Sequence, residues 1–276
     1  SRNIKFSVIL RPGTNHHWMH KKQISVFYAD LKDTNKLSKI LKNFDALINI
    51  ASLGFGNAKP IVEACEKAYL KRVVFLSSTS IYTSLNASSK KIRNNAENII
   101  KKSSLIWSII RPTMIYGTPK DRNMIKLIRW IDKVPLIPIF GNGNSLQQPI
   151  YVKDLASFIV DLLENENSFK NDFNLSGKNP LTFNEIIKVI SEILNKKPLK
   201  IYLPYLLCVK IISSIEYLKI KFPLKSEQIL RLNENKSFSY DKAFSLIGYD
   251  PIDFKDGIKD EIEMYKKLKG FNKFGN

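Results

Sequence analysis

Four consecutive hydroxyl residues follow directly after the short apolar run at residues 73–76: Ser77, Ser78, Thr79 and Ser80. A continuous apolar run of this length is typical of a strand that is buried on both faces of a parallel sheet. In open α/β sheets, ligands bind beyond the carboxyl ends of the strands, so hydroxyls placed there can hydrogen-bond an oxygen atom of a bound molecule. The same residues also suit a serine-rich turn that caps the next helix. The stretch alone favours neither interpretation.

Two other arrangements of side chains would be reactive: a histidine metal site and a serine hydrolase site. His16 and His20 are spaced to share one helix face, but no carboxylate or cysteine at ligand spacing accompanies them. We therefore expect a polar loop there and no metal site. A serine hydrolase would need a Gly-x-Ser-x-Gly elbow and a histidine later in the chain, and the sequence has neither.

The elements that must position these residues alternate between strands and helices. We predict strands at 4–10, 24–28, 46–51, 72–77 and 105–110, with helices at 34–43, 56–70 and 88–103 between them. This alternation is typical of βαβ units, and therefore of a parallel sheet with helices on both faces. Three residues are suited to cap the first two helices: Asp33, Thr34 and Asn57.

The pattern changes after residue 117. We predict a helix at 122–132, a Pro- and Gly-rich loop at 135–143, a strand at 149–152, a helix at 153–165 and a last sheet strand at 173–175. Thr182 and Glu185 form a capping box before a helix that ends near Leu194. The remainder is predicted to be mostly helical, with Gly248 ending one helix. We therefore predict a doubly wound parallel α/β domain over residues 1–180 and a small, mostly helical lobe over 181–276.

The chain is strongly basic, with 44 Lys and Arg against 25 Asp and Glu and a formal net charge of +19. The lysines are spread along every segment, and no basic stretch is interleaved with aromatic residues. We therefore expect solvated faces and no specific nucleic-acid partner. A positive field of this size also attracts anionic nucleotides or an anionic membrane surface, so weak association with a membrane surface remains open.

Cysteine usage and apolar content indicate the compartment. Cys65 and Cys208 lie in apolar helical patterns and make no disulfide framework, so we predict reduced core residues in a cytoplasmic protein. We expect no signal peptide before the first strand. The longest apolar stretch, at 201–220, is interrupted by Pro204, Lys210 and Glu216, so we expect no membrane span.

Six stretches together resemble the extended short-chain dehydrogenase/reductase family, in its nucleotide-sugar epimerase/dehydratase branch. They are ADL at 29–31, INIA at 48–51, VVFLSS at 73–78, RPTMIYG at 111–117, QPIYVKDLA at 148–156 and FNLSG at 173–177. Their order and spacing agree with the family over nearly the whole chain. The resemblance implies a Rossmann-like domain that binds NAD(P) and a C-terminal lobe that closes over a sugar nucleotide.

The resemblance also implies roles for individual residues. Asp30 and Leu31 would flank the adenine ring, and Ala51 would lie beside the cofactor. Ser78 takes the position of the hydroxyl that polarises the substrate oxygen, and Pro112 lies in the stretch that lines the nicotinamide pocket. Neighbouring residues complete the expected cofactor set: Ser52, Ser77, Arg111 and Thr113.

Arg11 stands at the end of the first predicted strand. NAD-preferring relatives use an acidic residue there to bind the ribose hydroxyls, whereas an arginine accommodates a 2′-phosphate. The guanidinium can bind that phosphate through two hydrogen bonds. We therefore expect NADP in preference to NAD, with a solvent-facing arginine in a turn as the alternative.

The first departure from the family is the lack of a Gly-x-x-Gly-x-x-Gly loop, which in the family holds the pyrophosphate at a helix N-terminus. Gly54 and Gly56 follow a later strand and do not replace it. The first predicted strand corresponds to the family's second, and the chain does not begin with Met. We therefore expect a fragment that lacks the first strand, the loop and the first helix, and that binds dinucleotide poorly.

The second departure is the Tyr-x-x-x-Lys pair, whose positions hold Ser89 and Arg93. In the family the lysine lowers the pKa of the tyrosine, whose phenolate takes the substrate proton, and losing a positioned acid/base typically costs about 10²–10⁴-fold. Tyr82 and Tyr116 are the nearest replacement phenols. The pattern is similar to the atypical branch of the family, whose members keep the fold and often lack the tyrosine.

Three further residues are expected near a substrate. Asp121 and Arg122 follow the nicotinamide-lining stretch, with a solvated helix start as the alternative. Gln147 stands where sugar-nucleotide enzymes often have an arginine that binds a phosphate. This difference weakens the expectation that the substrate is a UDP-sugar.

We therefore predict an NAD(P)-dependent epimerase, dehydratase or reductase that acts on a nucleotide-linked sugar or a similar polyol. Hydride would pass to the nicotinamide while Ser78 orients the reacting oxygen. The main alternative is a nucleotide-binding sensor or assembly protein without turnover. A third is a peripheral membrane protein that uses its cationic surface and the apolar helix at 203–220.

Overall fold

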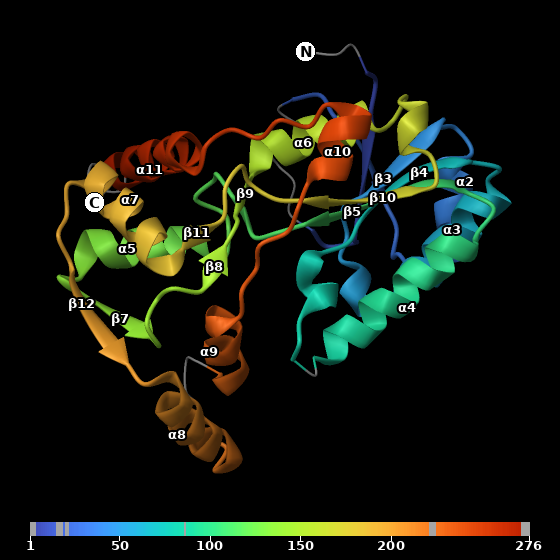
Figure 1. Cartoon of the computed structure of the whole chain (residues 1–276). Helices are drawn as coiled ribbons and strands as arrows, with labels where there is room; N and C mark the ends of the chain where they lie inside the picture. Colours follow the sequence, from blue (N-terminus) through green and yellow to red (C-terminus); the bar gives the residue numbers. More distant parts are fainter. Residues whose placement is uncertain (1–3, 15–18, 20–21, 86, 221–224, 272–276) are drawn as a thin grey trace. The chain divides into compact units, whose positions relative to one another are not determined.

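The computed structural model describes residues 4–14, 19, 22–85, 87–220 and 225–271 (Figure 1). Its packing divides the chain into two compact units. Unit 1 takes residues 1–82, 86–110 and 161–172, and unit 2 takes 83–85, 111–160 and 173–276. The prediction placed the stretch 111–160 in the first domain, with a boundary at residue 180. In the structure this stretch belongs to unit 2, because it packs with C-terminal helices.

Unit 1 is built on parallel strands. β3 (Ala46–Asn49), β4 (Arg72–Leu76) and β5 (Ile106–Pro112) pair in parallel, and β10 (Asn171–Leu175) follows β5 in the strand order β10-β5-β4-β3. β1 (Ser7–Leu10) and β2 (Ser25–Tyr28) form a separate parallel pair. The predicted parallel α/β sheet is confirmed, with strand ends displaced by a few residues.

Five helical segments connect the strands of unit 1: α2 (Thr34–Leu41), η1 (Leu53–Phe55), α3 (Ala58–Lys67), η2 (Thr79–Tyr82) and α4 (Ser88–Lys102). α3 and α4 lie side by side (Figure 1). The buried faces of these helices meet Val73 and Phe75 of β4 in one hydrophobic cluster, which Ile9 of β1 also joins. The separate strand pair therefore shares the core of the unit.

The predicted helix caps have mixed outcomes. The Asp33 carboxylate accepts a hydrogen bond from the backbone N–H of Lys36 at 2.9 Å and caps α2, as predicted. Asn57 occupies the N-cap position of α3 but makes no capping hydrogen bond with its side chain. The capping box of Thr182 and Glu185 is present, and Gly248 ends its helix at φ +81°.

Unit 2 packs three helices around a second hydrophobic cluster: α5 (Met124–Lys133), α7 (Phe183–Leu194) and α11 (Phe254–Phe271). Four short strands pair as β6 (Ile115–Tyr116) with β9 (Ile150–Tyr151) and β8 (Leu146–Gln147) with β11 (Leu181–Thr182). The remaining helices are α6 (Val152–Asp161), α8 (Tyr205–Tyr217), α9 (Ser226–Asn233) and α10 (Asp241–Ile247).

The predicted loop at 135–143 is wrong over its first half. Leu136–Phe140 forms β7, which pairs in parallel with β12 (Leu199–Leu203). Pro138 is tolerated because this sheet has only two strands, and each strand is therefore an edge. The partner strand lies some sixty residues later, so local sequence does not reveal the pairing.

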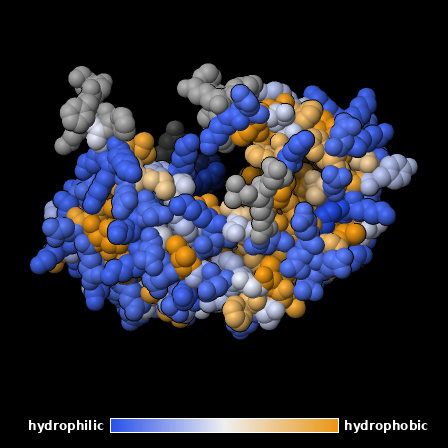
Figure 2. Space-filling view, turned by 90° about the horizontal axis from the view of Figure 1, so that it is seen from above, coloured by the Kyte–Doolittle hydropathy of each residue, from blue (hydrophilic) through white to orange (hydrophobic). Residues whose placement is uncertain are grey.

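The two cysteines differ in burial. Cys65 lies in the core of unit 1, whereas Cys208 on α8 is only half-buried, which corrects its prediction as a core residue. Polar side chains cover much of the face shown in Figure 2, as the high charge requires. Among the described residues, no helix is long and apolar enough to cross a membrane.

Candidate functional site

The carboxyl ends of β3 and β4 lie together at one edge of the unit 1 sheet. Asn49, the last residue of β3, is the register partner of Phe75 in β4, and the two strands are parallel. The residues that follow each strand therefore emerge at the same edge. The structure thus brings two pairs of predicted site residues to one edge: Ala51 with Ser52, and Ser77 with Ser78.

The loop after β3 is held by short side chains. The Asn49 amide donates to the Ala51 carbonyl at 3.1 Å, and the Ser52 hydroxyl accepts from the backbone N–H of Gly54 at 3.2 Å. Gly56 then takes φ +75°, a backbone conformation that glycine adopts without strain. These contacts fix a tight loop beyond the strand.

The serines after β4 have different roles. The buried Ser77 hydroxyl donates to the Glu97 carboxylate at 2.6 Å, so Ser77 anchors α4. The Ser78 hydroxyl oxygen accepts from the backbone N–H of Ser80 at 3.2 Å. An oxygen that accepts this N–H still has its own proton to donate. Ser78 therefore suits both interpretations of the stretch, because it forms a turn and can also hydrogen-bond a ligand.

α4 turns one charged face toward this edge. Ser89, Arg93 and Glu97 are spaced four residues apart, so they share a helix face. The Arg93 guanidinium lies over Gly54, where a Cβ atom would be only 3.0 Å from Nη2. Because Ser77 and Glu97 are also joined, α4 brings the guanidinium and the end of β4 to the same part of unit 1.

The sequence does not reveal the position of Arg93 over Gly54 and shows it only as a departure from a family pattern. Its contact with Gly54 spans 39 positions of sequence, which no local pattern reveals. The one available signal is its position a single helical turn before Glu97, on the face that meets the strand ends.

The carboxyl ends of β1 and β2 carry the predicted adenine-side residues. The backbone N–H of Ala29 donates to the Leu10 carbonyl at 3.0 Å, so the two strands end side by side. Arg11 is exposed directly after β1, and Leu31 packs on the core cluster. The Asp30 carboxylate accepts from the backbone N–H of Lys32 at 2.8 Å, which forms a tight turn.

The predicted residues at the end of β5 are buried. Arg111, Pro112 and Thr113 are all buried, and the Thr113 hydroxyl donates to the Gln148 carbonyl at 2.5 Å. Gln147 is also buried, and its amide donates to the Glu234 carbonyl at 3.3 Å. The side chains of Thr113 and Gln147 therefore hold unit 2 together.

Tyr116 does not have the surroundings of a general base. Its phenol is 1% exposed, packs between the rings of Tyr151 and Phe254, and donates to the Phe254 carbonyl at 3.4 Å. Burial raises the pKa of Tyr116, whereas a base at neutral pH needs a lowered one. Tyr82 lies on η2, shortly after Ser78, and is 46% exposed. Of the two phenols, Tyr82 therefore stays the candidate acid/base.

A buried carboxyl group lies beside another predicted substrate residue in unit 2. Glu261 of α11 is inaccessible and accepts from the backbone N–H of Gly117 at 2.6 Å. Burial, and then the neighbouring Asp121 carboxylate, raise the pKa of Glu261 to about 9. Asp121 accepts from the backbone N–H of Asn123 at 2.6 Å, at the start of α5. Glu261 therefore joins α11 to the backbone of Gly117, close to the start of α5.

Replacing Glu261 with glutamine should flatten the pH dependence of stability. The wild-type side chain stays protonated when folded but ionises near pH 4.5 when unfolded. The contribution of Glu261 to the free energy of unfolding is therefore fully present below pH 4.5. It falls, by at most about 1.4 kcal/mol per pH unit, as the pH rises toward 9. Glu261→Gln keeps an acceptor for the Gly117 N–H without the ionisation. We expect it to raise the free energy of unfolding at pH 8 by about 2–3 kcal/mol, measured by urea denaturation.

The control for this prediction is the exposed neighbour Glu263 on the same helix. Glu263→Gln should leave the curve of stability against pH unchanged. Parallel curves for Glu261→Gln and the wild type between pH 5 and 9 would show that Glu261 is ionised in the folded protein.

The described residues contain no group of three or more His, Cys, Asp or Glu side chains that could hold a metal ion. The loop predicted from His16 and His20 lies outside the described residues.

A parallel α/β sheet with short polar loops and a guanidinium at its carboxyl edge defines a Rossmann-like, nucleotide-binding class of protein. A comparison with family models agrees, since the model described as NAD(P)H-binding matches residues 2–166. The chain belongs to this NAD(P)H-binding family, and its fold is that of the extended short-chain dehydrogenase/reductase epimerases.

Two relatives with known names differ in kind. The mitochondrial NADH dehydrogenase (ubiquinone) 1 alpha subcomplex subunit 9 of Arabidopsis thaliana is 24% identical over 266 residues, which are 90% of this chain and 64% of that protein. N-acetyl-alpha-D-glucosaminyl-diphospho-ditrans,octacis-undecaprenol 4-epimerase of Escherichia coli O157:H7 is 24% identical over 282 residues, with 86% and 84% covered. The chain thus spans less than two thirds of the plant relative.

Solved structures support the same fold. The UDP-glucuronic acid 4-epimerase of Bacillus cereus, in complex with UDP-glucuronic acid and NAD, has a TM-score of 0.69 and 19% identity, with 91% of this chain and 84% of that chain covered. At this identity the likeness establishes the fold.

Proposed function

We propose that the whole protein is an NAD(P)-dependent oxidoreductase of the epimerase type that acts on a nucleotide-linked sugar or a similar polyol. The observation that carries the proposal is the group formed by Ser52, Arg93 and Ser78 at the carboxyl edge of the unit 1 sheet. The named relatives and the family supply the cofactor and substrate classes.

The residues at this edge fit part of a nicotinamide dinucleotide. Hydroxyls and a guanidinium suit the ribose hydroxyls and phosphate oxygens, which are rich in hydrogen-bond acceptors. Ala51 is small and half-buried, which leaves room for a planar ring. The sequence has no Gly-x-x-Gly-x-x-Gly loop, so in our proposal these residues hold the nicotinamide half and Arg11 and Asp30 hold the adenosine half.

Oxidation of a substrate alcohol removes a hydride from carbon and a proton from the hydroxyl. The bound cofactor supplies the hydride acceptor. Ser78 donates its proton to the reacting oxygen in a hydrogen bond, which orients the alcohol and stabilises the developing carbonyl. Tyr82, in its phenolate form, is proposed to receive the hydroxyl proton and to return it when the carbonyl is reduced from the other face, which inverts the carbon.

Among the predicted substrate residues, Arg122 is the strongest choice for a phosphate contact. It is exposed directly before α5, whereas Asp121 and Gln147 are engaged with neighbouring elements. Its guanidinium can bind a diphosphate with paired hydrogen bonds.

The proposed preference for NADP depends on Arg11. It is exposed at the end of β1, where a turn follows through the hydrogen bond from the Thr14 N–H to the Arg11 carbonyl at 3.1 Å. This position leaves the guanidinium able to bind a 2′-phosphate. Arg111, Pro112 and Thr113 stay proposed as residues of the nicotinamide side, and all three are buried.

The test is an activity assay on the whole protein. It is incubated with NAD or NADP and with UDP-glucose or UDP-glucuronic acid, and the sugar products are separated by chromatography. The proposal predicts formation of the 4-epimer only when cofactor is present. Lack of any product, together with saturable cofactor binding, would instead support the second candidate.

The second candidate is a dinucleotide-binding assembly subunit without turnover. Ser89 and Arg93 stand where the family has its catalytic Tyr and Lys, and the Arabidopsis relative is named as a subunit of NADH dehydrogenase. In that case the dinucleotide stabilises unit 1, and Ser78 has no effect on any measured rate.

A further inference from the structure

Helix α8 of unit 2 packs one face against α9 and exposes large apolar side chains on its other side. Ile212 is buried on the packed face, with Cys208 and Val209 half-buried beside it. Leu206, Leu207 and Ile211 are 60%, 55% and 52% exposed. Exposed apolar side chains gathered in this way normally mark a surface that meets a protein or lipid partner. The described residues of unit 2 do not cover this side of α8.

The apolar surface continues beyond the helix. Tyr217 is 87% exposed, and Leu218 and Ile220 directly after it are 65% and 57% exposed. Several large apolar side chains that follow one another in this way form a patch that a soluble monomer does not normally present. We call the exposed apolar residues between Leu206 and Ile220 the α8 patch.

Charge along the segment that carries the α8 patch is almost entirely positive, and Glu227 of the neighbouring α9 is paired with Arg231 at 2.6 Å. Between Leu199 and Lys225 the sequence has five lysines and a single acid, Glu216. Glu216 is already engaged, because it accepts hydrogen bonds from the N–H and the hydroxyl of Ser226 at 3.3 and 2.6 Å. Lys210 and Lys219 are exposed beside the apolar residues. Whatever covers the patch must therefore accept both apolar contact and positive charge.

Physical arguments select one occupant. A second copy of the chain would bring the same lysines against these lysines, in a protein with a net charge of +19, and like charges repel. α8 is also too short to span a membrane, since thirteen residues make about 20 Å of helix against a hydrocarbon thickness of about 30 Å. A helix with an apolar body and flanking lysines is suited to lie in the interface of an anionic bilayer.

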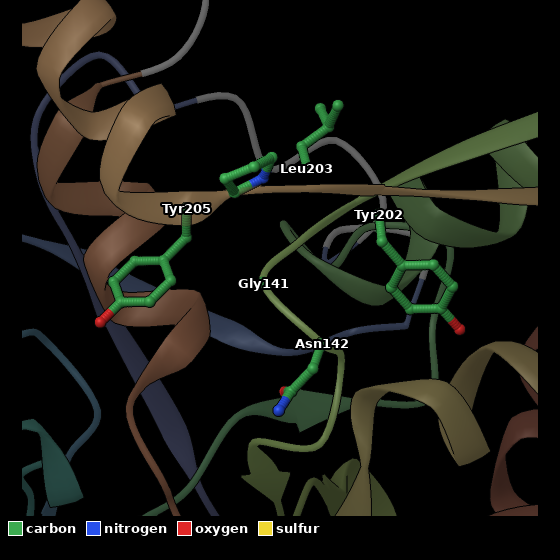
Figure 3. A pocket seen from close by; sticks show the side chains of 6 residues that line it. Gly141, Asn142, Tyr202, Leu203 and Tyr205 are labelled. Atoms are coloured by element: carbon green, nitrogen blue, oxygen red, sulfur yellow. The ribbon is translucent and has the colours of Figure 1, made fainter.

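A small open pocket lies where β12 leads into α8 (Figure 3). It has a volume of about 360 Å³ and is lined by Gly141, Asn142, Tyr202, Leu203, Pro204 and Tyr205. The rings of Tyr202 and Tyr205 stand on either side of it, with their hydroxyls pointing away from each other (Figure 3). Tyrosine is enriched at membrane–water interfaces because its ring is apolar and its hydroxyl is polar. The pocket thus extends the α8 patch with aromatic side chains of that kind.

We propose that the α8 patch docks unit 2 onto the surface of an anionic phospholipid membrane, with Leu206, Leu207 and Ile211 entering the interface and the nearby lysines contacting the headgroups. The proposal is independent of the catalytic role of Ser78, since it places no demand on unit 1.

The test is co-sedimentation of the whole protein with vesicles of phosphatidylcholine, with and without phosphatidylglycerol. The wild type should bind the anionic vesicles and lose binding as salt is raised, because screening weakens the attraction of the lysines. The double variant Leu207→Ser with Ile211→Ser, one helical turn apart, should lower the partition coefficient by about tenfold or more.

The matched control changes two equally exposed apolar residues elsewhere in unit 2. Phe244 and Leu268 are 58% and 54% exposed, on α10 and α11. The control double variant, Phe244→Ser with Leu268→Ser, should partition as the wild type does, and circular dichroism should show both variants folded. Equal binding by the α8 variant, or no binding by the wild type, would overturn the proposal. So would a dimer in sedimentation velocity that the α8 substitutions dissociate.

Discussion

Replacing Ser78 with alanine should lower kcat by about 10²–10³-fold and change the Kd of the cofactor by less than about twofold. The expectation follows from the position of the hydroxyl, which comes two residues after the end of β4 and is fixed by the N–H of Ser80 at 3.2 Å. The proton it retains is the one proposed to hydrogen-bond the reacting oxygen. Steady-state rates with a sugar nucleotide and calorimetric titration of the cofactor give the two quantities.

Ser80 offers a matched control two residues away in the same turn. Its hydroxyl is buried and has no hydrogen-bond partner in the described structure, so Ser80→Ala removes the same atom without removing a contact. The Ser80 variant should keep the wild-type rate. If both variants turn over equally fast, Ser78 does not orient the substrate oxygen. A protein with no turnover at all, whose cofactor affinity neither substitution changes, would match the assembly subunit instead.

Replacing Arg72 with alanine should destabilise the folded protein by about 3–5 kcal/mol. Arg72 begins β4 at the opposite end from Ser77 and is 8% exposed. Its guanidinium donates to the Ile106 carbonyl at 2.9 Å, to the Leu163 carbonyl at 3.1 Å and to the Leu162 carbonyl. It also donates to the hydroxyls of Ser108 and Ser168 at 3.0 and 2.8 Å. Alanine would remove all five of these hydrogen bonds to buried acceptors.

The large effect depends on the shape of the guanidinium as well as on its charge. Burial lowers the pKa of Arg72 to about 10, which still leaves it ionised at neutral pH. Arg72→Lys keeps a charge, but its single ammonium group cannot reach all five acceptors that surround the planar guanidinium. We therefore expect lysine to recover less than half of the stability that alanine loses. Arg129→Ala, at an exposed position of α5, should change stability by less than about 0.5 kcal/mol. Urea denaturation in which Arg72→Ala matches Arg129→Ala would contradict the account.

Local patterns in the sequence predicted the elements that position the unit 1 site. Val73, Val74 and Phe75 are buried, as the continuous apolar character of the run indicated, and the hydroxyls after it stand at the carboxyl edge. Asp33 and the Thr182–Glu185 box cap their helices because capping depends on residues only three positions apart. Signals of this kind are short-range, and so sequence alone reveals them.

The features that sequence did not reveal depend on contacts between distant positions. Arg72 meets acceptors that lie 34 to 96 residues further along the chain. The pairing of β7 with β12 and the contact of Glu261 with Gly117 are of the same kind. Burial also decides chemistry in ways that residue type cannot, since Tyr116 and Tyr82 are both phenols and only the latter is exposed.

The central claim is that the carboxyl edge of the unit 1 sheet binds a nicotinamide dinucleotide and that Arg93 contacts it. Isothermal titration calorimetry of the whole protein with NADP and with NAD tests this most directly, with Arg93→Ala as the variant and Arg129→Ala as the control. The account predicts one saturable site per chain, tighter binding of NADP than of NAD, and about tenfold weaker binding by Arg93→Ala, equivalent to about 1.4 kcal/mol. No saturable binding of either dinucleotide, or equal affinity for Arg93→Ala and Arg129→Ala, would contradict it.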